Sequence, residues 1–196
     1  VMRSRALYEL ALTYPPKSSE FKQFNEQAAK ELADLFEKYS SWPIGFYAHL
    51  YEGQCYQALG QWKLAIGCFE DILSVNDTNP TMRKLITLAH GYQADCYNAQ
   101  KAYDEVLAKN RPWLEQSRST ERSGPEWVAL QYHIAEAARL KAATLDERDR
   151  QRPRLLSQAR DLYRVVSREG GEYQKPARIA LAELGRGEAD IPQPKS

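Results

Sequence analysis

The chain has 196 residues, of which 43% are hydrophobic, and its formal net charge is +1 at pH 7. This apolar content suffices to bury a core and argues against a disordered chain, and the balanced charge indicates no general preference for polyanions. Its apolar runs are too short to cross a bilayer, so we expect no membrane contact.

The first two predicted helices lie on either side of a turn at residues 15–19. The pattern of residues 1–14 is helical from the start, without a capping residue before it, which is typical of a segment of a longer protein. Two prolines and the polar residues after them break this helix. A second helix is predicted over residues 19–39, ending before Pro43.

Residues 46–75 predict two antiparallel helices joined by a corner at Gly60 and Gln61. Small residues at Gly53 and Ala65 allow the two backbones to approach each other, and large apolar residues fill the space between them. These large residues are Tyr56, Leu59, Trp62, Ile66, Phe69 and Leu73.

The spacing within this hairpin carries a family resemblance. Gly53-x2-Tyr56 is followed by Ala65-x3-Phe69, as in the pattern W-x2-L-G-x2-Y…A-x3-F…P. The hairpin therefore resembles a tetratricopeptide repeat. His49 and Glu52 stand at the positions of the family's Trp and Leu.

The same pattern recurs 41 residues later. AHLYEGQCYQA (48–58) aligns with AHGYQADCYNA (89–99), with six identical residues. A second step of 41 places Ala135 where the first two copies have Gly53 and Ala94. Successive first helices thus carry a small residue at the same close-contact position, which predicts one hairpin repeated along the chain.

The second half of the chain continues this pattern. A return helix is predicted from Lys101, with a break at Pro112 because a proline does not fit in a helix interior without a kink. Residues 117–125 are predicted to form a loop. The next helix covers residues 126–145 and carries its apolar residues on one face.

The last return helix repeats the A-x3-F signature as Ala159-x3-Tyr163, and two glycines at 170–171 end it. Residues 176–184 predict a short capping helix. We expect one repeat domain over residues 1–185 and a loose tail over residues 186–196.

The predicted fold is all-α. No segment alternates apolar and polar residues with period two, so we expect no strands. The pattern predicts nine helices, arranged as four hairpins and a C-terminal cap. Because a hairpin buries only one face by itself, neighbours must stack, and the resemblance implies a right-handed superhelical solenoid.

Histidines and cysteines do not predict a metal site. His49 and His90 each precede a cysteine by six residues, which turns the two side chains about 240° apart on a helix, whereas zinc needs converging ligands. The cysteines are odd in number and form no CxxC pair, so we expect reduced thiols in the core. They are Cys55, Cys68 and Cys96. Free thiols favour a cytoplasmic location, and a targeting or membrane segment elsewhere in a parent protein is left open.

No catalytic or cofactor motif is found. The carboxylates at residues 70–71 and 146–149 are interpreted as solvated surface, and neither glycine-rich nucleotide motif occurs. We therefore expect no enzyme, no cofactor and no metal ion.

Residues 139–154 hold six basic and three acidic residues. A nucleic-acid surface needs a longer basic stripe with aromatic residues between the charges, so we interpret this segment as a solvated charged turn and expect no nucleic-acid partner. RNA binding stays as the first alternative function, because related helical repeats read RNA base by base.

The resemblance also implies a binding surface. In tetratricopeptide proteins the first helix of each repeat lines a concave groove with its second, fifth, ninth and twelfth residues. Carried over to this sequence, these positions include Tyr47, Leu50, Gln54, Gln57, Asp95, Asn98, Tyr132, Glu136 and Arg139. We expect a non-catalytic scaffold that binds a peptide or protein in this groove. A regulatory module of a larger enzyme is the second alternative, and the identity of the partner and the oligomeric state are left open.

Overall fold

The computed structural model describes residues 2–75, 79–117 and 124–189. Within these ranges the chain is all helical and has no strand, as predicted. The described residues form nine helices, the predicted number, when the contiguous elements of residues 103–116 are taken as one. Not one helix in this part of the chain has both the length and the apolar composition that spanning a bilayer requires.

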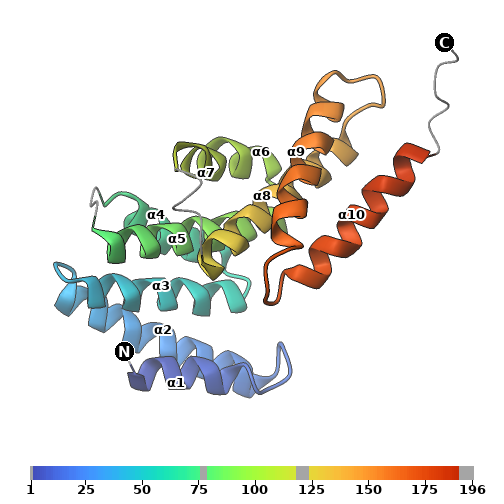
Figure 1. Cartoon of the computed structure of the whole chain (residues 1–196). Helices are drawn as coiled ribbons and strands as arrows, with labels where there is room; N and C mark the ends of the chain where they lie inside the picture. The colour runs from blue at the N-terminus through green and yellow to red at the C-terminus, as the bar shows by residue number, and fades with distance from the viewer. Residues whose placement is uncertain (1, 76–78, 118–123, 190–196) are drawn as a thin grey trace, which may run out of the picture. The chain divides into compact units, whose positions relative to one another are not determined.

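The chain divides into two compact units, Val1–Cys96 (the N-terminal unit) and Tyr97–Ser196 (the C-terminal unit). The N-terminal unit contains α1 (Met2–Ala11), α2 (Ser19–Tyr39), α3 (Pro43–Ala58), α4 (Trp62–Leu73) and most of α5 (Pro80–Ala99). Within it α1 packs on α2, α2 on α3 and α3 on α4 (Figure 1). From α1 to α4, each helix thus lies against the next one along the chain.

The boundaries of α2 and α3 follow from local chemistry. The Ser18 hydroxyl accepts a hydrogen bond from the Phe21 backbone N–H at 3.1 Å and so caps α2. The helix then covers Ser19–Tyr39, the predicted range. Pro43 begins α3, at a position where a helix leaves the backbone N–H unused.

The α3–α4 hairpin has its corner and its close contact at the predicted glycines. Gly60 has a φ of +71°, a left-handed conformation that favours glycine. At Gly53, a β-carbon would lie 2.5 Å from Cε1 of Phe69 on α4. Phe69 is fully buried and also stacks on Tyr92 of α5, with ring centroids 5.8 Å apart. The prediction that Gly53 lies where two helices touch is confirmed.

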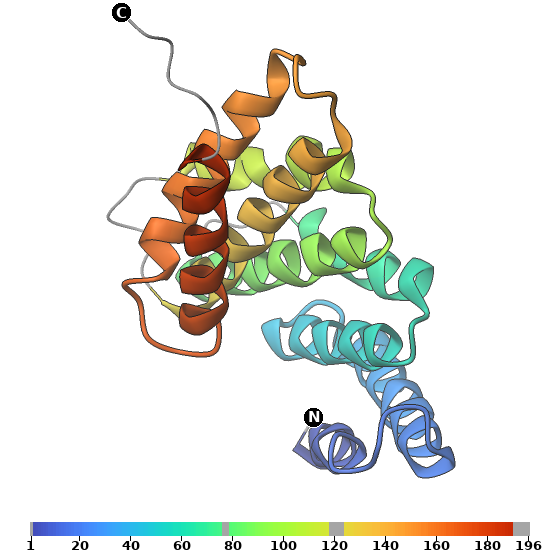
Figure 2. The ribbon, with the colours of Figure 1, turned by 90° about the vertical axis from the view of Figure 1, so that its right-hand side faces the viewer.

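The C-terminal unit begins within the last turn of α5. It contains α6 (Tyr103–Glu105), η1 (Val106–Asn110), α7 (Arg111–Gln116), α8 (Pro125–Thr144), α9 (Gln151–Val166) and α10 (Gln174–Ala189). α9 packs against α8 and against α10, which lies beside it (Figure 2). Their shared core includes Ala135, Ala159 and Tyr163, all fully buried. Ala135 therefore occupies a packing position, as its alignment with Gly53 predicts.

The predicted break at Pro112 is wrong. The helix continues from α6 through η1 into α7 and ends at Gln116. η1 is a π-helical turn, in which the Arg111 backbone N–H donates to the carbonyl oxygen of Val106, five residues earlier. An α-helix breaks at proline because the ring meets the carbonyl four residues before it. The wider π turn changes this local geometry, so a change of helix type replaces the break.

The C-terminal helix is longer than predicted. α10 covers Gln174–Ala189, whereas the sequence predicts a cap over residues 176–184. Residues 118–123 of the predicted loop and residues 190–196 of the predicted tail lie outside the described residues. A single repeat domain over residues 1–185 and a superhelical stack remain predictions.

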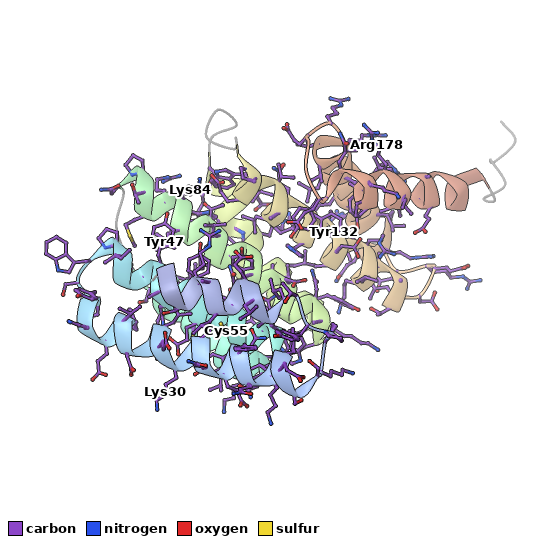
Figure 3. The ribbon with its side chains drawn as sticks, turned by 90° about the horizontal axis from the view of Figure 1, so that it is seen from below. Lys30, Tyr47, Cys55, Lys84, Tyr132 and Arg178 are labelled. Atoms are coloured by element: carbon purple, nitrogen blue, oxygen red, sulfur yellow. The ribbon has the colours of Figure 1, made fainter. Side chains whose placement is uncertain are left out.

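All three cysteines are reduced and buried, as predicted. Cys55 packs in a cluster of small and apolar side chains from α2 and α3 that includes Ala28, Leu32 and Ala48. Figure 3 shows Cys55 inside the N-terminal unit, whereas Lys30 of α2 points outward. In this cluster, small residues allow α2 and α3 to pack closely.

Candidate functional site

The nine residues predicted to line a groove lie on α3, α5 and α8, and they differ in exposure. Leu50 and Gln54 on α3 are only 2% and 7% exposed. Their side chains therefore contribute to the interior of the N-terminal unit rather than to its surface. The other seven are partly exposed: Tyr47, Gln57, Asp95, Asn98, Tyr132, Glu136 and Arg139.

Two of these residues meet within the N-terminal unit. The amide Nε2 of Gln57 donates a hydrogen bond to Oδ2 of Asp95 at 2.6 Å. The bond joins α3 to α5. Tyr47 lies toward the other end of α3, about 15 Å from Gln57 along the helix axis. The partly exposed side chains thus extend along α3 and across to α5.

The C-terminal unit holds three side chains in one polar network, formed by Glu136, Arg139 and Tyr163. Arg139 donates from Nη2 to Glu136 at 2.8 Å and from Nε to the Tyr163 hydroxyl at 3.3 Å. That hydroxyl in turn donates to the second carboxylate oxygen of Glu136. Burial and the neighbouring Glu136 carboxylate raise the pKa of Tyr163 far above its ordinary value. The network connects α8 to α9, so both predicted groove residues also have a structural role.

Tyr132 lies in an aromatic group beside this network. Its ring centroid is 6.0 Å from that of Tyr163 and 4.8 Å from that of Tyr173. The neighbouring His133 offers its backbone carbonyl to the side-chain amide of Asn98 at 2.9 Å. Truncation of Tyr132 would therefore remove packing contacts with Tyr163 and Tyr173 as well as a partly exposed aromatic side chain.

A separate constellation, here called the His49 cluster, consists of His49 and Glu52 on α3 and Cys68 and Asp71 on α4. His49 Nδ1 lies 2.8 Å from Oε2 of Glu52, and Nε2 lies 3.1 Å from Oδ2 of Asp71. The ligand atoms of His49, Glu52 and Cys68 all lie within 4.8 Å of one another. Nitrogen, oxygen and sulfur donors thus converge between two helices.

The imidazole ring of His49 is held in place by its surroundings. Phe36 stacks on its face, with ring centroids 3.9 Å apart and planes at 11°. Ionised carboxylates only accept hydrogen bonds, so both ring nitrogens carry protons when both bonds are made. Burial alone would lower the pKa of His49, but the hydrogen bonds to Glu52 and Asp71 outweigh it and raise the pKa.

The cluster reaches solvent on one side. His49, Glu52 and Cys68 are nearly fully buried, whereas the Asp71 side chain is 67% exposed. Burial, followed by the Glu52 carboxylate, raises the pKa of the Cys68 thiol well above its ordinary value. The same two causes raise the pKa of Tyr56 to about 12. Cys68 is therefore a protonated thiol in this setting and not an activated nucleophile.

The second copy of the repeat has different chemistry at the same positions. His90 and Gln93 on α5 correspond to His49 and Glu52, and both are buried. Burial lowers the pKa of His90 to about 4, so this imidazole is neutral near pH 7. The residue that corresponds to Cys68 is Lys109. The carboxylate and the thiol are thus features of the first copy and not of the second.

The sequence contained a signal for this cluster. His49 and Cys55 point to different faces of α3, so this pair does not indicate a site. The partners of His49 are Glu52, one turn further along α3, and Asp71 on α4. His49-x2-Glu52 and Cys68-x2-Asp71 have the same spacing on facing helices. In addition, His49 and Glu52 replace two apolar residues of the tetratricopeptide pattern.

No protein-family model, curated protein or solved structure matches the chain. The resemblance to tetratricopeptide repeats therefore rests on the spacing of the residues quoted above.

Proposed function

We propose that the chain is a non-catalytic scaffold that binds a peptide or protein through the first helices of its hairpins. The observation that supports this proposal is the hydrogen bond between Gln57 on α3 and Asp95 on α5, because it places partly exposed amide and carboxylate groups of two helices side by side. Such groups pair with the backbone and side chains of a bound peptide. Tyr47 adds an aromatic contact of the kind that dominates binding energy at interfaces.

RNA binding has less support from the described residues. In the charged turn, Asp146 accepts a hydrogen bond from the Arg148 backbone N–H at 2.9 Å, and Asp149 accepts one from the Gln151 backbone N–H at 2.7 Å. These carboxylates stay among the arginines and repel phosphate groups. The acidic residues therefore shape the turn and weaken its attraction for nucleic acid.

The test is a selection of peptides from a displayed random library on the whole chain, followed by titration of an enriched peptide. Tyr47→Ala should weaken its binding by more than about 1 kcal/mol, because a contacting aromatic side chain is lost. Asp95→Asn keeps the shape of the side chain and removes its charge, so it should weaken the binding of peptides that carry a basic residue. Lys30→Ala, on the outward side of α2 (Figure 3), is the matched control and should bind like the parent.

The same titration separates the two functions. A triple variant in which Arg148, Arg150 and Arg152 become Ala should bind the peptide normally. If the library yields no peptide that depends on Tyr47, or if only the triple variant loses binding and single-stranded RNA competes, the scaffold proposal is overturned.

A further inference from the structure

We propose that His49, Glu52 and Cys68 form a binding site for one Zn²⁺ ion, with Asp71 orienting the His49 ring. The donor atoms of the three ligands lie within 4.8 Å of one another, and each of the three residues is at least nine-tenths buried. Imidazole, thiolate and carboxylate are the side-chain ligands that zinc uses in proteins.

The ligand atoms, which lie within 4.8 Å of one another, must move by up to about 1 Å to hold the ion. In a tetrahedral zinc site with bonds of 2.0–2.3 Å, two ligand atoms are about 3.3–3.8 Å apart. The distance between His49 Nδ1 and Glu52 Oε2 is 2.8 Å, so these atoms must separate by about half an ångström. The three ligands leave a fourth position for water, which is the arrangement of open zinc sites.

Asp71 supplies the support that a zinc-bound histidine requires. When Nδ1 binds the metal, Nε2 keeps its proton and donates a hydrogen bond to the carboxylate of Asp71, at the present distance of 3.1 Å. Metal-binding histidines almost always have such a partner, which sets the tautomer and the orientation of the ring. Stacking on Phe36 restricts the ring further. The exposed side of the cluster at Asp71 gives the ion access from solvent.

Binding replaces protons with the metal. A proton on His49 Nδ1 and the proton of the Cys68 thiol leave to solvent as the bonds from nitrogen and sulfur to the ion form, because zinc binds a neutral imidazole and a thiolate. The Glu52 carboxylate supplies the oxygen ligand. The two positive charges of the ion are then balanced by one thiolate and one carboxylate beside a neutral imidazole.

Packing alone does not require this residue set. The second copy keeps the histidine as His90 and places the uncharged Gln93 where the first copy has Glu52. Burying an ion pair costs desolvation energy that a neutral pair avoids. A ligand site explains why the first copy combines the carboxylate with a thiol from the facing helix.

The test uses the tag-free whole chain, reduced and stripped of metal with a chelator. Zn²⁺ should bind with a stoichiometry of one per chain and raise the melting temperature. Co²⁺, used as a spectroscopic substitute, should produce thiolate-to-metal charge-transfer absorption and the strong visible bands of a four-coordinate ion. Cys68→Ser should abolish the charge-transfer band, and Asp71→Asn should lower Zn²⁺ affinity by about 10- to 100-fold, as loss of an orienting partner does.

Matched controls come from the same protein. Cys55→Ser and His90→Gln change a buried cysteine and a buried histidine outside the cluster, so both should keep the affinity and the cobalt spectrum. Asp71→Asn changes an exposed side chain, so its result stands even if Cys68→Ser fails to fold. The proposal is overturned if the parent chain shows no thiolate band, if the band survives in Cys68→Ser, or if Asp71→Asn binds Zn²⁺ as tightly as the parent.

Discussion

Gly53 and Gly67 are both helical glycines of the α3–α4 hairpin, but their surroundings are opposite. A β-carbon at Gly53 would meet the ring of Phe69, which is fully buried and cannot move without disturbing its neighbours. A β-carbon at Gly67 would have no atom within 4 Å. The cost of a side chain at each site is therefore decided by packing and not by the glycine itself.

Gly53→Leu should destabilise the chain by about 1–3 kcal/mol, because it overpacks the contact between α3 and α4. Gly67→Ala should stabilise it by about 0.5–1 kcal/mol, because alanine is the better helix former where space is free. Urea denaturation of the parent and the two variants measures both effects. Equal midpoints for Gly53→Leu and the parent would contradict the packing of this hairpin.

His90 should make stability depend on pH. Its folded pKa of about 4 lies below the ordinary histidine value of 6.5, so the unfolded chain binds more protons between these two values. Stability should therefore fall as the pH is lowered from 6.5 to 4, by up to about 3 kcal/mol from this residue.

Unfolding free energies at several pH values, compared between the parent and His90→Gln, isolate this contribution from other titrating groups. As the pH is lowered from 6.5 to 4, the unfolding free energy of His90→Gln should fall less steeply than that of the parent. Identical slopes in the two proteins would show that His90 is protonated in the folded state as easily as in the unfolded state.

At the scale of elements, α8 and α9 are joined by a polar network beside their shared apolar core. Tyr163 is fully buried and connects Glu136 and Arg139 of α8 to α9. Burial makes each of these hydrogen bonds costly to lose, since the remaining groups keep their desolvation penalty.

Tyr163→Phe should therefore cost about 1–3 kcal/mol, although it removes a single oxygen atom. Hydrogen exchange should show faster opening of the backbone amides in α9. Arg164→Ala on the same helix is the control, because it breaks an exposed pair with Asp161 and should change stability by less than about 0.5 kcal/mol. Similar losses in both variants would mean that the network contributes no more than a surface ion pair.

At the scale of the whole molecule, the three cysteines all belong to the unit Val1–Cys96. Burial raises the pKa of Cys55 and of Cys96 to about 12 in each case, and it raises that of Cys68 as well. A buried thiol with a raised pKa reacts only after the structure around it opens. Thiol reactivity therefore reports on the stability of this unit.

Under native conditions a thiol reagent should label Cys55 and Cys96 slowly and with the same dependence on urea. Mass spectrometry of digested samples measures each site separately. The Gly53→Leu variant should speed up labelling of both, because it destabilises the unit that contains them. Rapid labelling of Cys55 in the native parent chain would contradict its burial.

The sequence by itself determined the helices and much of their contact pattern. Helix ends depend on local chemistry, such as the turn before Ser19 and the left-handed Gly60, so they can be read from neighbouring residues. The start of α3 at Pro43 lies three residues before the predicted hairpin. The contact of Gly53 with Phe69 was also predictable, because small and large residues recur at fixed spacing in a hairpin.

The tertiary structure alone decided which side chains from different elements meet. The partners of His49 come partly from α4, and the exposure of Leu50 and Gln54 depends on what packs around α3, so neither follows from spacing within one helix. Tertiary packing also determines the conformation of the chain before Pro112. A local rule predicts a helix break there, but a π turn lets the helix continue, and Leu114 beyond it is buried. Local sequence sets the conformations available to a segment, and the packing of the whole unit selects among them.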